Sequence, residues 1–224
     1  MFLILNPANG PQDELENSFI GGQPKLPSHC RPKPCSLCES SQTFFFQVAF
    51  PASHPWSGYS LAVFACTACA GKGSLIPEMV QDLKGPISEP FLVSYQRNFQ
   101  LIVFPTSDSE RVQDYDEKIQ YIPLTLSTIP DEYVIGQVGG SPQWIYGDER
   151  PSSIGDQPPI FLLQLFSYLE FGILNSASPQ MSLNLAGEPE PSDDDFYSLF
   201  IGNALYLFGS EPSKGLVYAL TQVG

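Results

Sequence analysis

The chain has 224 residues, of which 42% are apolar and 12% aromatic, so it can bury a core and is not a disordered chain. Its 10 basic and 24 acidic side chains give a net charge of -14, and such a field repels phosphate backbones, which disfavours nucleic-acid binding. With 18 Gly, 22 Pro and many Phe and Tyr, short strands joined by turns are favoured over long helices. We therefore expect a β-rich α+β protein.

The first five residues are apolar, but this run has no basic flank and stops at Asn6 and Pro7. It is too short for the apolar region of a signal peptide or for a membrane span. We expect a cytoplasmic protein with no membrane partner.

Four of the five cysteines form two Cys-x-x-Cys pairs, Cys35 with Cys38 and Cys66 with Cys69. Two such pairs supply the four soft, tetrahedral ligands that zinc prefers, and four thiolates leave no open position for water or substrate. We therefore expect a structural zinc ion. Disulfides, which need an oxidising compartment, and free thiols are the alternatives. Cys30 is close enough in sequence to replace Cys35.

Two parts of the chain resemble each other. Each has a glycine pair, an aromatic strand that contains a glutamine, and a later apolar strand. From the second glycine to the glutamine the distance is 47 - 22 = 25 residues in the first part and 164 - 140 = 24 in the second. The expected strands are residues 44–48, 59–64, 161–165 and 203–208. Gly21, Gly22, Gly139 and Gly140 are best explained as turns that need positive φ.

This internal repeat predicts two related β units packed as one compact domain, residues 1–224. The first unit, residues 19–70, contains the zinc pairs, and the second, residues 132–224, contains none. Residues 71–131 connect the two units.

Outside the repeated strands the patterns are weaker. Residues 76–84 favour a short helix, and residues 91–95 and 99–104 favour strands with a turn between them. Residues 108–117 hold five acids and one arginine, which indicates a solvated loop or frayed helix. The Pro- and Gly-rich segment 168–200 is expected to be an exposed loop.

Gln47 and Gln164 occupy the same place in two otherwise apolar strands. In the structural interpretation each amide satisfies buried backbone groups of the neighbouring turn. In the alternative they are polar anchors in a cleft between the two units.

The acidity is uneven: residues 71–224 hold 7 basic and 20 acidic groups, a balance of -13. Such a field speeds encounter with a basic protein, although it also serves solubility alone. A binding protein needs apolar anchors beside its charges. The candidate contacts are Asp193, Asp194, Asp195, Phe196, Tyr197, Trp144 and Tyr146. The aromatic pair after the aspartates is equally explained as the start of a core strand.

The glycine pairs, glutamine strands and cysteine pairs together resemble the programmed cell death protein 2 family, and also the YwqG-like bacterial proteins. The resemblance covers residues 19–70, 138–166 and 203–221. It implies non-catalytic protein binding. The bacterial proteins imply an immunity-type inhibitor that neutralises a toxin, and the eukaryotic family implies a chaperone of a basic ribosomal protein.

An enzyme ranks third. His29 and His54 are the two histidines, and His29 is next to Cys30, where an extended chain points neighbouring side chains to opposite faces. His54 is expected in a turn, with a substitute zinc ligand as the alternative. The chain has no glycine-rich phosphate loop, nucleophile elbow or His-Glu-x-x-His motif.

Overall fold

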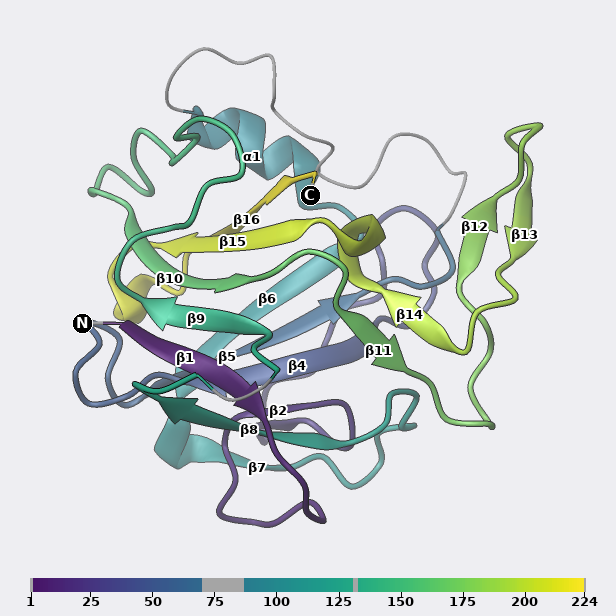
Figure 1. Cartoon of the computed structure of the whole chain (residues 1–224), viewed down its shortest axis with the longest axis horizontal. Helices are drawn as coiled ribbons and strands as arrows, with labels where there is room; N and C mark the ends of the chain where they lie inside the picture. Colours follow the sequence, from purple (N-terminus) through teal and green to yellow (C-terminus); the bar gives the residue numbers. More distant parts are fainter. Residues whose placement is uncertain (1, 70–86, 131–132, 224) are drawn as a thin grey trace.

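The computed structural model describes residues 2–69, 87–130 and 133–223. Ten of its strands form one antiparallel sheet (Figure 1), which confirms the β-rich expectation. In spatial order they are β16 (Val217–Gln222), β15 (Ala204–Gly209), β10 (Ile160–Leu165), β9 (Gly136–Gly139), β1 (Phe2–Pro7), β8 (Ile122–Ser127), β2 (Phe19–Ile20), β4 (Thr43–Ala49), β5 (Tyr59–Ala65) and β6 (Phe99–Pro105).

The sheet curls until its two edge strands, β16 and β6, come into contact, so it is nearly closed. β1 and β8 pair at its middle, with β9, β10, β15 and β16 on one side and β2, β4, β5 and β6 on the other. The main core lies inside this curl, where Phe45 and Val63 of one side join the same apolar cluster as Leu163 and Leu207 of the other.

The continuous apolar runs of β4 and β10 are explained by bulges, since a regular strand alternates its faces. The register of β4 against β5 shifts between Phe44 and Phe46, so that Phe45 and Phe46 both join the main core. The register of β10 against β15 shifts between Phe161 and Leu163. The four repeated strands predicted from the sequence are thus β4, β5, β10 and β15.

All four glycines of the two pairs have positive φ, as predicted: 58° and 66° at Gly21 and Gly22, and 69° and 76° at Gly139 and Gly140. Gly21 also has no room for a side chain, because a Cβ there would lie 2.3 Å from the carbonyl oxygen of Gln120. Only glycine fits such a position without moving the backbone.

Three two-stranded sheets accompany the large sheet in the described residues. They are β3 (Lys25–Pro27) with β7 (Ser109–Arg111), β11 (Glu170–Gly172) with β14 (Phe196–Ser198), and β12 (Met181–Leu183) with β13 (Pro189–Pro191). The 3-10 helices are η1 (Thr106–Asp108), η2 (Leu199–Gly202) and η3 (Pro212–Lys214). Segment 168–200 is therefore not a loop but two nested hairpins, and segment 108–117 contains a strand.

One α-helix, α1 (Glu89–Tyr95), occurs in the described ranges, so the strand predicted at 91–95 is wrong. Pro90 fits the first turn of a helix, where its missing N–H costs nothing. Leu92 is buried against the β16 side of the sheet, whereas Val93 is 55% exposed. The strand at 99–104 is confirmed as β6, and the predicted helix at 76–84 lies outside the described residues.

No helix in the described part of the chain has both the length and the apolar character needed to cross a bilayer.

Candidate metal centre

The first cysteine pair lies in the loop between β3 and β4. The N–H of Cys35 donates to the carbonyl of Ser40 at 2.9 Å, and the N–H of Glu39 donates to the carbonyl of Cys35 at 2.9 Å. Glu39 has φ of 62°, in the left-handed region that turns the chain sharply. This turn aims the thiols of Cys35 and Cys38 in one direction.

The second pair lies where β5 ends. The N–H of Cys66 donates to the carbonyl of Asn98, next to β6, at 2.7 Å. The N–H of Ala68 donates to the sulfur of Cys66 at 3.4 Å, and a hydrogen bond of this kind favours the thiolate. The bond to Asn98, beside the edge strand β6, therefore fixes the position of Cys66.

The two pairs meet, and their four sulfur atoms lie within 4.8 Å of one another. The Sγ atoms of Cys35 and Cys69 are 3.2 Å apart, those of Cys38 and Cys69 3.3 Å, and those of Cys38 and Cys66 3.5 Å. A tetrahedral ion with bonds of about 2.3 Å spaces its sulfurs about 3.8 Å apart, whereas a disulfide needs about 2.05 Å. The cysteines are free thiols, and their arrangement can hold a metal ion.

The electrostatics of the cluster differ between its thiols. Burial raises the pKa of Cys66 to about 12 and also raises the pKa of Cys69. At Cys38 burial acts in the same direction, but hydrogen bonds from Ser40 and the neighbouring thiols outweigh it and lower the pKa to about 6. Four thiolates repel one another at this spacing, and a bound cation removes that repulsion.

The other candidate ligands lie elsewhere. Cys30 is outside the four-sulfur group and packs against the apolar cluster beneath β4 and β5. His29, its neighbour, is exposed. His54 is buried in the turn after β4, where its ring stacks on Phe50 and its Nδ1 accepts the N–H of Trp56 at 3.0 Å.

The second cysteine pair also contacts a distant segment, which the sequence did not predict. Thr67 lies between the two cysteines, and its carbonyl accepts the N–H of Met181 in β12 at 2.9 Å. Its hydroxyl lies 3.2 Å from that of Thr43 in β4. A backbone hydrogen bond between segments so far apart in the sequence leaves no local sequence pattern, so the contact between Thr67 and Met181 could not be predicted.

The two strand glutamines are buried and bind backbone. Gln47 accepts the N–H of Lys25 at 3.2 Å and donates to the carbonyl of Asn17 at 3.4 Å. Gln164 accepts the N–H of Gln143 at 2.8 Å and donates to its carbonyl at 3.0 Å. Each amide therefore holds the segment that follows a glycine pair.

The candidate contact residues have different surroundings. The three aspartates 193–195 are exposed, and Tyr146 is 52% exposed. Phe196 is half-buried, and the half-buried Trp144 stacks on Tyr206 with ring centroids 4.5 Å apart. Tyr197 is buried and donates its hydroxyl to Ser178, so it belongs to the core and offers no side-chain surface to a partner.

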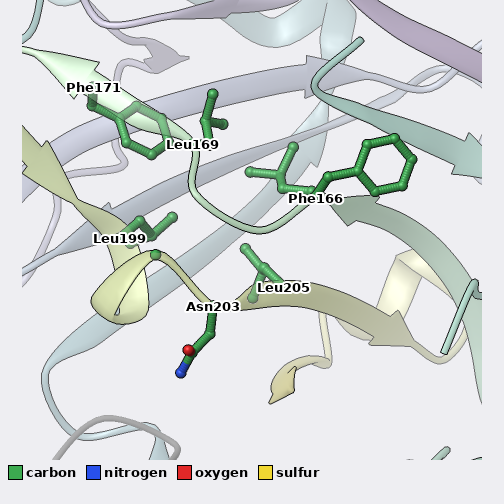
Figure 2. Close-up of a pocket in the computed structure, with 8 residues that line it drawn as sticks. Phe166, Leu169, Phe171, Leu199, Asn203 and Leu205 are labelled. Carbon is green, nitrogen blue, oxygen red and sulfur yellow. The ribbon is translucent and has the colours of Figure 1, made fainter. Parts of the chain in front are cut away.

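Figure 2 shows a hollow beneath η2, near the ends of β10 and β15. Its volume is about 10 Å³, which is room for about one water molecule. The labelled lining residues are Phe166, Leu169, Phe171, Leu199, Asn203 and Leu205. This hollow has no acid, base or nucleophile in its lining and is too small for a substrate.

Comparison of the sequence with protein-family models and with curated proteins gives no match.

Proposed function

We propose that this chain is a non-catalytic binding protein for a basic protein, held in shape by a structural zinc ion. The observation that carries the proposal is the four-thiol cluster, because four sulfur ligands complete a tetrahedral ion and leave no position for water or substrate. Bound there, zinc supplies a crosslink and no chemistry. Cys35 and Cys38 then hold the loop before β4 against Cys66 and Cys69 at the end of β5.

The charge distribution supports a basic partner. Within the described ranges, Glu14 pairs with Arg111 and Asp148 with Arg150, and no other ion pair is formed. Lys25 is buried, with its ammonium group on backbone and side-chain oxygens. Most acids of the described residues therefore face solvent outside any ion pair, and such a surface speeds encounter with a positive one.

We propose a bacterial toxin as the first target class, as the resemblance to YwqG-like proteins implies. The runner-up is a nascent basic ribosomal protein, as the resemblance to the programmed cell death protein 2 family implies. Both targets use the same acidic surface, so the identity of the bound protein decides between them.

We also infer that the halves of the sheet are two copies of one unit in a single domain. Three features support this: positive φ in both glycine pairs, a strand bulge at the same distance before each glutamine, and the same bond from each glutamine to the third residue after its glycine pair. Lys25 and Gln143 are those third residues.

The test uses the intact, metal-loaded chain, immobilised and exposed to host extract at low and at high salt. A matched variant replaces Asp193, Asp194 and Asp195 with asparagine, which removes charge with little change of shape. We expect the retained proteins to be basic, and retention to fall with salt and in the variant. Retention of acidic proteins, or retention that ignores salt, contradicts the proposal, and turnover of a retained molecule would assign the chain to an enzyme class.

A further inference from the structure

The inner hairpin of segment 168–200 stands out from the rest of the molecule (Figure 1). We call β12, β13 and the turn between them the arm, residues 180–192. Its base is firmly held. Gln180 donates its amide to the carbonyl of Ser198 at 3.0 Å and accepts the N–H of Ser198 at 2.8 Å. Met181 donates its N–H to Thr67 in the second cysteine pair at 2.9 Å.

The arm has one apolar and one polar face. Met181 pairs with Pro191, and Leu183 pairs with Pro189, and directly paired residues share a face of a two-stranded sheet. The residues between them in each strand are Ser182 and Glu190, which point to the other face. Leu183 is 54% exposed and both prolines are exposed, so the apolar face has no partner within the described structure.

The turn of the arm places another apolar side chain at the tip. Asn184 accepts the N–H groups of Ala186 and Glu188, each at 2.9 Å, and Gly187 takes a positive φ of 78°. These bonds fix the turn, and Leu185 at its tip is fully exposed. A partner can therefore meet Leu185 without the entropic cost of ordering a loop.

The β13 edge of the arm is unsuited to the addition of another strand. Ser192 donates its N–H to the carbonyl of Gln180 at 2.7 Å, and hydrogen-bonded pairs recur at every second residue of an antiparallel ladder. The backbone nitrogens of Pro189 and Pro191 therefore face the outer edge of β13, where they have no hydrogen to donate. The β13 edge therefore resists pairing with another strand, and the apolar face of the arm offers side chains for recognition.

The charge of the segment that carries the arm favours a basic occupant. No lysine or arginine occurs between Arg150 and Lys214. The acids in and beside the arm are Glu188, Glu190, Asp193, Asp194 and Asp195. A second copy of this chain would bring the same acids and be repelled, whereas a basic surface with an apolar recess matches both the charge and the apolar face.

We propose that the arm is the docking element for the basic protein partner. The apolar face and Leu185 enter an apolar recess of the partner, and the surrounding carboxylates contact its lysines and arginines. This inference rests on the proposed function and assigns that function to one surface.

The test is a selection of displayed random short peptides on the immobilised, metal-loaded wild-type chain. Enriched peptides are then titrated against a Leu183→Ser/Leu185→Ser variant and against Ile129→Ser, a matched control in which an exposed apolar residue (71% exposed) outside the arm is replaced. Circular dichroism and metal content establish that each variant is folded. Sedimentation of the wild type and the double variant measures self-association.

We expect enriched peptides to combine basic and apolar residues, to lose affinity about tenfold or more for the double variant, and to keep it for Ile129→Ser. Basic peptides that bind both variants equally would overturn the arm as the docking element and leave the proposed function standing. Absence of enriched basic peptides would count against both. A wild-type dimer that the double variant loses would assign the arm to a second copy and overturn the proposal.

Discussion

The loops that follow the two glycine pairs are anchored in different ways. In the first half, Cys35 and Cys38 bring the loop before β4 to the cysteines at the end of β5. In the second half, β15 ends in Gly209 without a cysteine, and a buried glutamine of β16 holds the loop before β10.

That glutamine is Gln222, and its side chain makes four bonds to the loop. Its carbonyl oxygen accepts the N–H groups of Ile145 at 2.9 Å and Tyr146 at 3.2 Å. Its amide donates to the carbonyl of Gly147 at 3.1 Å and to the buried carboxylate of Glu149 at 3.0 Å. The loop before β4 and the loop before β10 are thus held by different chemistry. The first is held by the cysteine cluster and the second by the side-chain amide of Gln222.

We expect the largest effect from a substitution that disrupts the cysteine cluster, the anchor of the first half. Cys66→Ser takes away one of the four candidate ligands and leaves the thiols of Cys35, Cys38 and Cys69 with an incomplete site. We expect loss of bound metal and a fall in the free energy of unfolding on the order of 5 kcal/mol, because metal binding and folding are coupled. Elemental analysis and urea unfolding measure the two quantities.

Cys30→Ser is the matched control for this change, since Cys30 lies outside the cluster. It should keep the metal and most of the stability. A Cys66→Ser protein with full metal content, or with unchanged stability, would show that the cluster is not the anchor of the first half.

The second anchor is tested by Gln222→Leu. Gln222 is fully buried, so leucine leaves the Glu149 carboxylate without its donor and removes the acceptor for two backbone N–H groups. We expect a loss of about 2 to 3 kcal/mol with metal content unchanged. Loss of metal in this variant would mean that the two anchors are not independent.

The smallest effect concerns the turn between β4 and β5, which contacts the other half of the sheet where Trp56 donates its indole N–H to the carbonyl of Ser210 at 2.8 Å. Burial lowers the pKa of the neighbouring His54 below its ordinary 6.5. Above pH 6.5 the histidine is neutral in both states and the stability is complete. As the pH falls below 6.5, the unfolded chain takes up a proton that the folded chain resists, so stability is lost.

His54→Asn keeps an acceptor for the Trp56 N–H and removes the titrating ring. We expect the wild type to lose stability more steeply than this variant as the pH falls below 6.5, in paired urea titrations. Parallel curves for the two proteins would exclude His54 as the source of the pH dependence.

Local chemistry made part of this molecule predictable. The glycine pairs, the four cysteines and the glutamine strands each follow from a rule that acts within a few residues: positive φ, ligand type, or alternation with one buried amide. The strands β4, β5, β6, β10 and β15 were found for the same reason.

What the sequence did not reveal depends on contacts between distant segments. The apolar run before Gln96 indicated a strand. In the structure this segment is the helix α1, which packs against β16 of the large sheet. The sequence favoured a surface and a core position of Tyr197 equally. In the structure its ring lies in the core, with its centroid 6.2 Å from that of Phe45. The amphipathic character of the arm depends on the pairing of Leu183 with Pro189, which no local pattern specifies.

Thr67 gives the cysteine centre an influence beyond its own half. Its carbonyl, enclosed between two ligands, receives the N–H of Met181 at the start of β12. This bond links the direction in which the arm leaves the body to the geometry of the cysteine cluster. Under the proposed function we therefore expect metal content and partner affinity to change together.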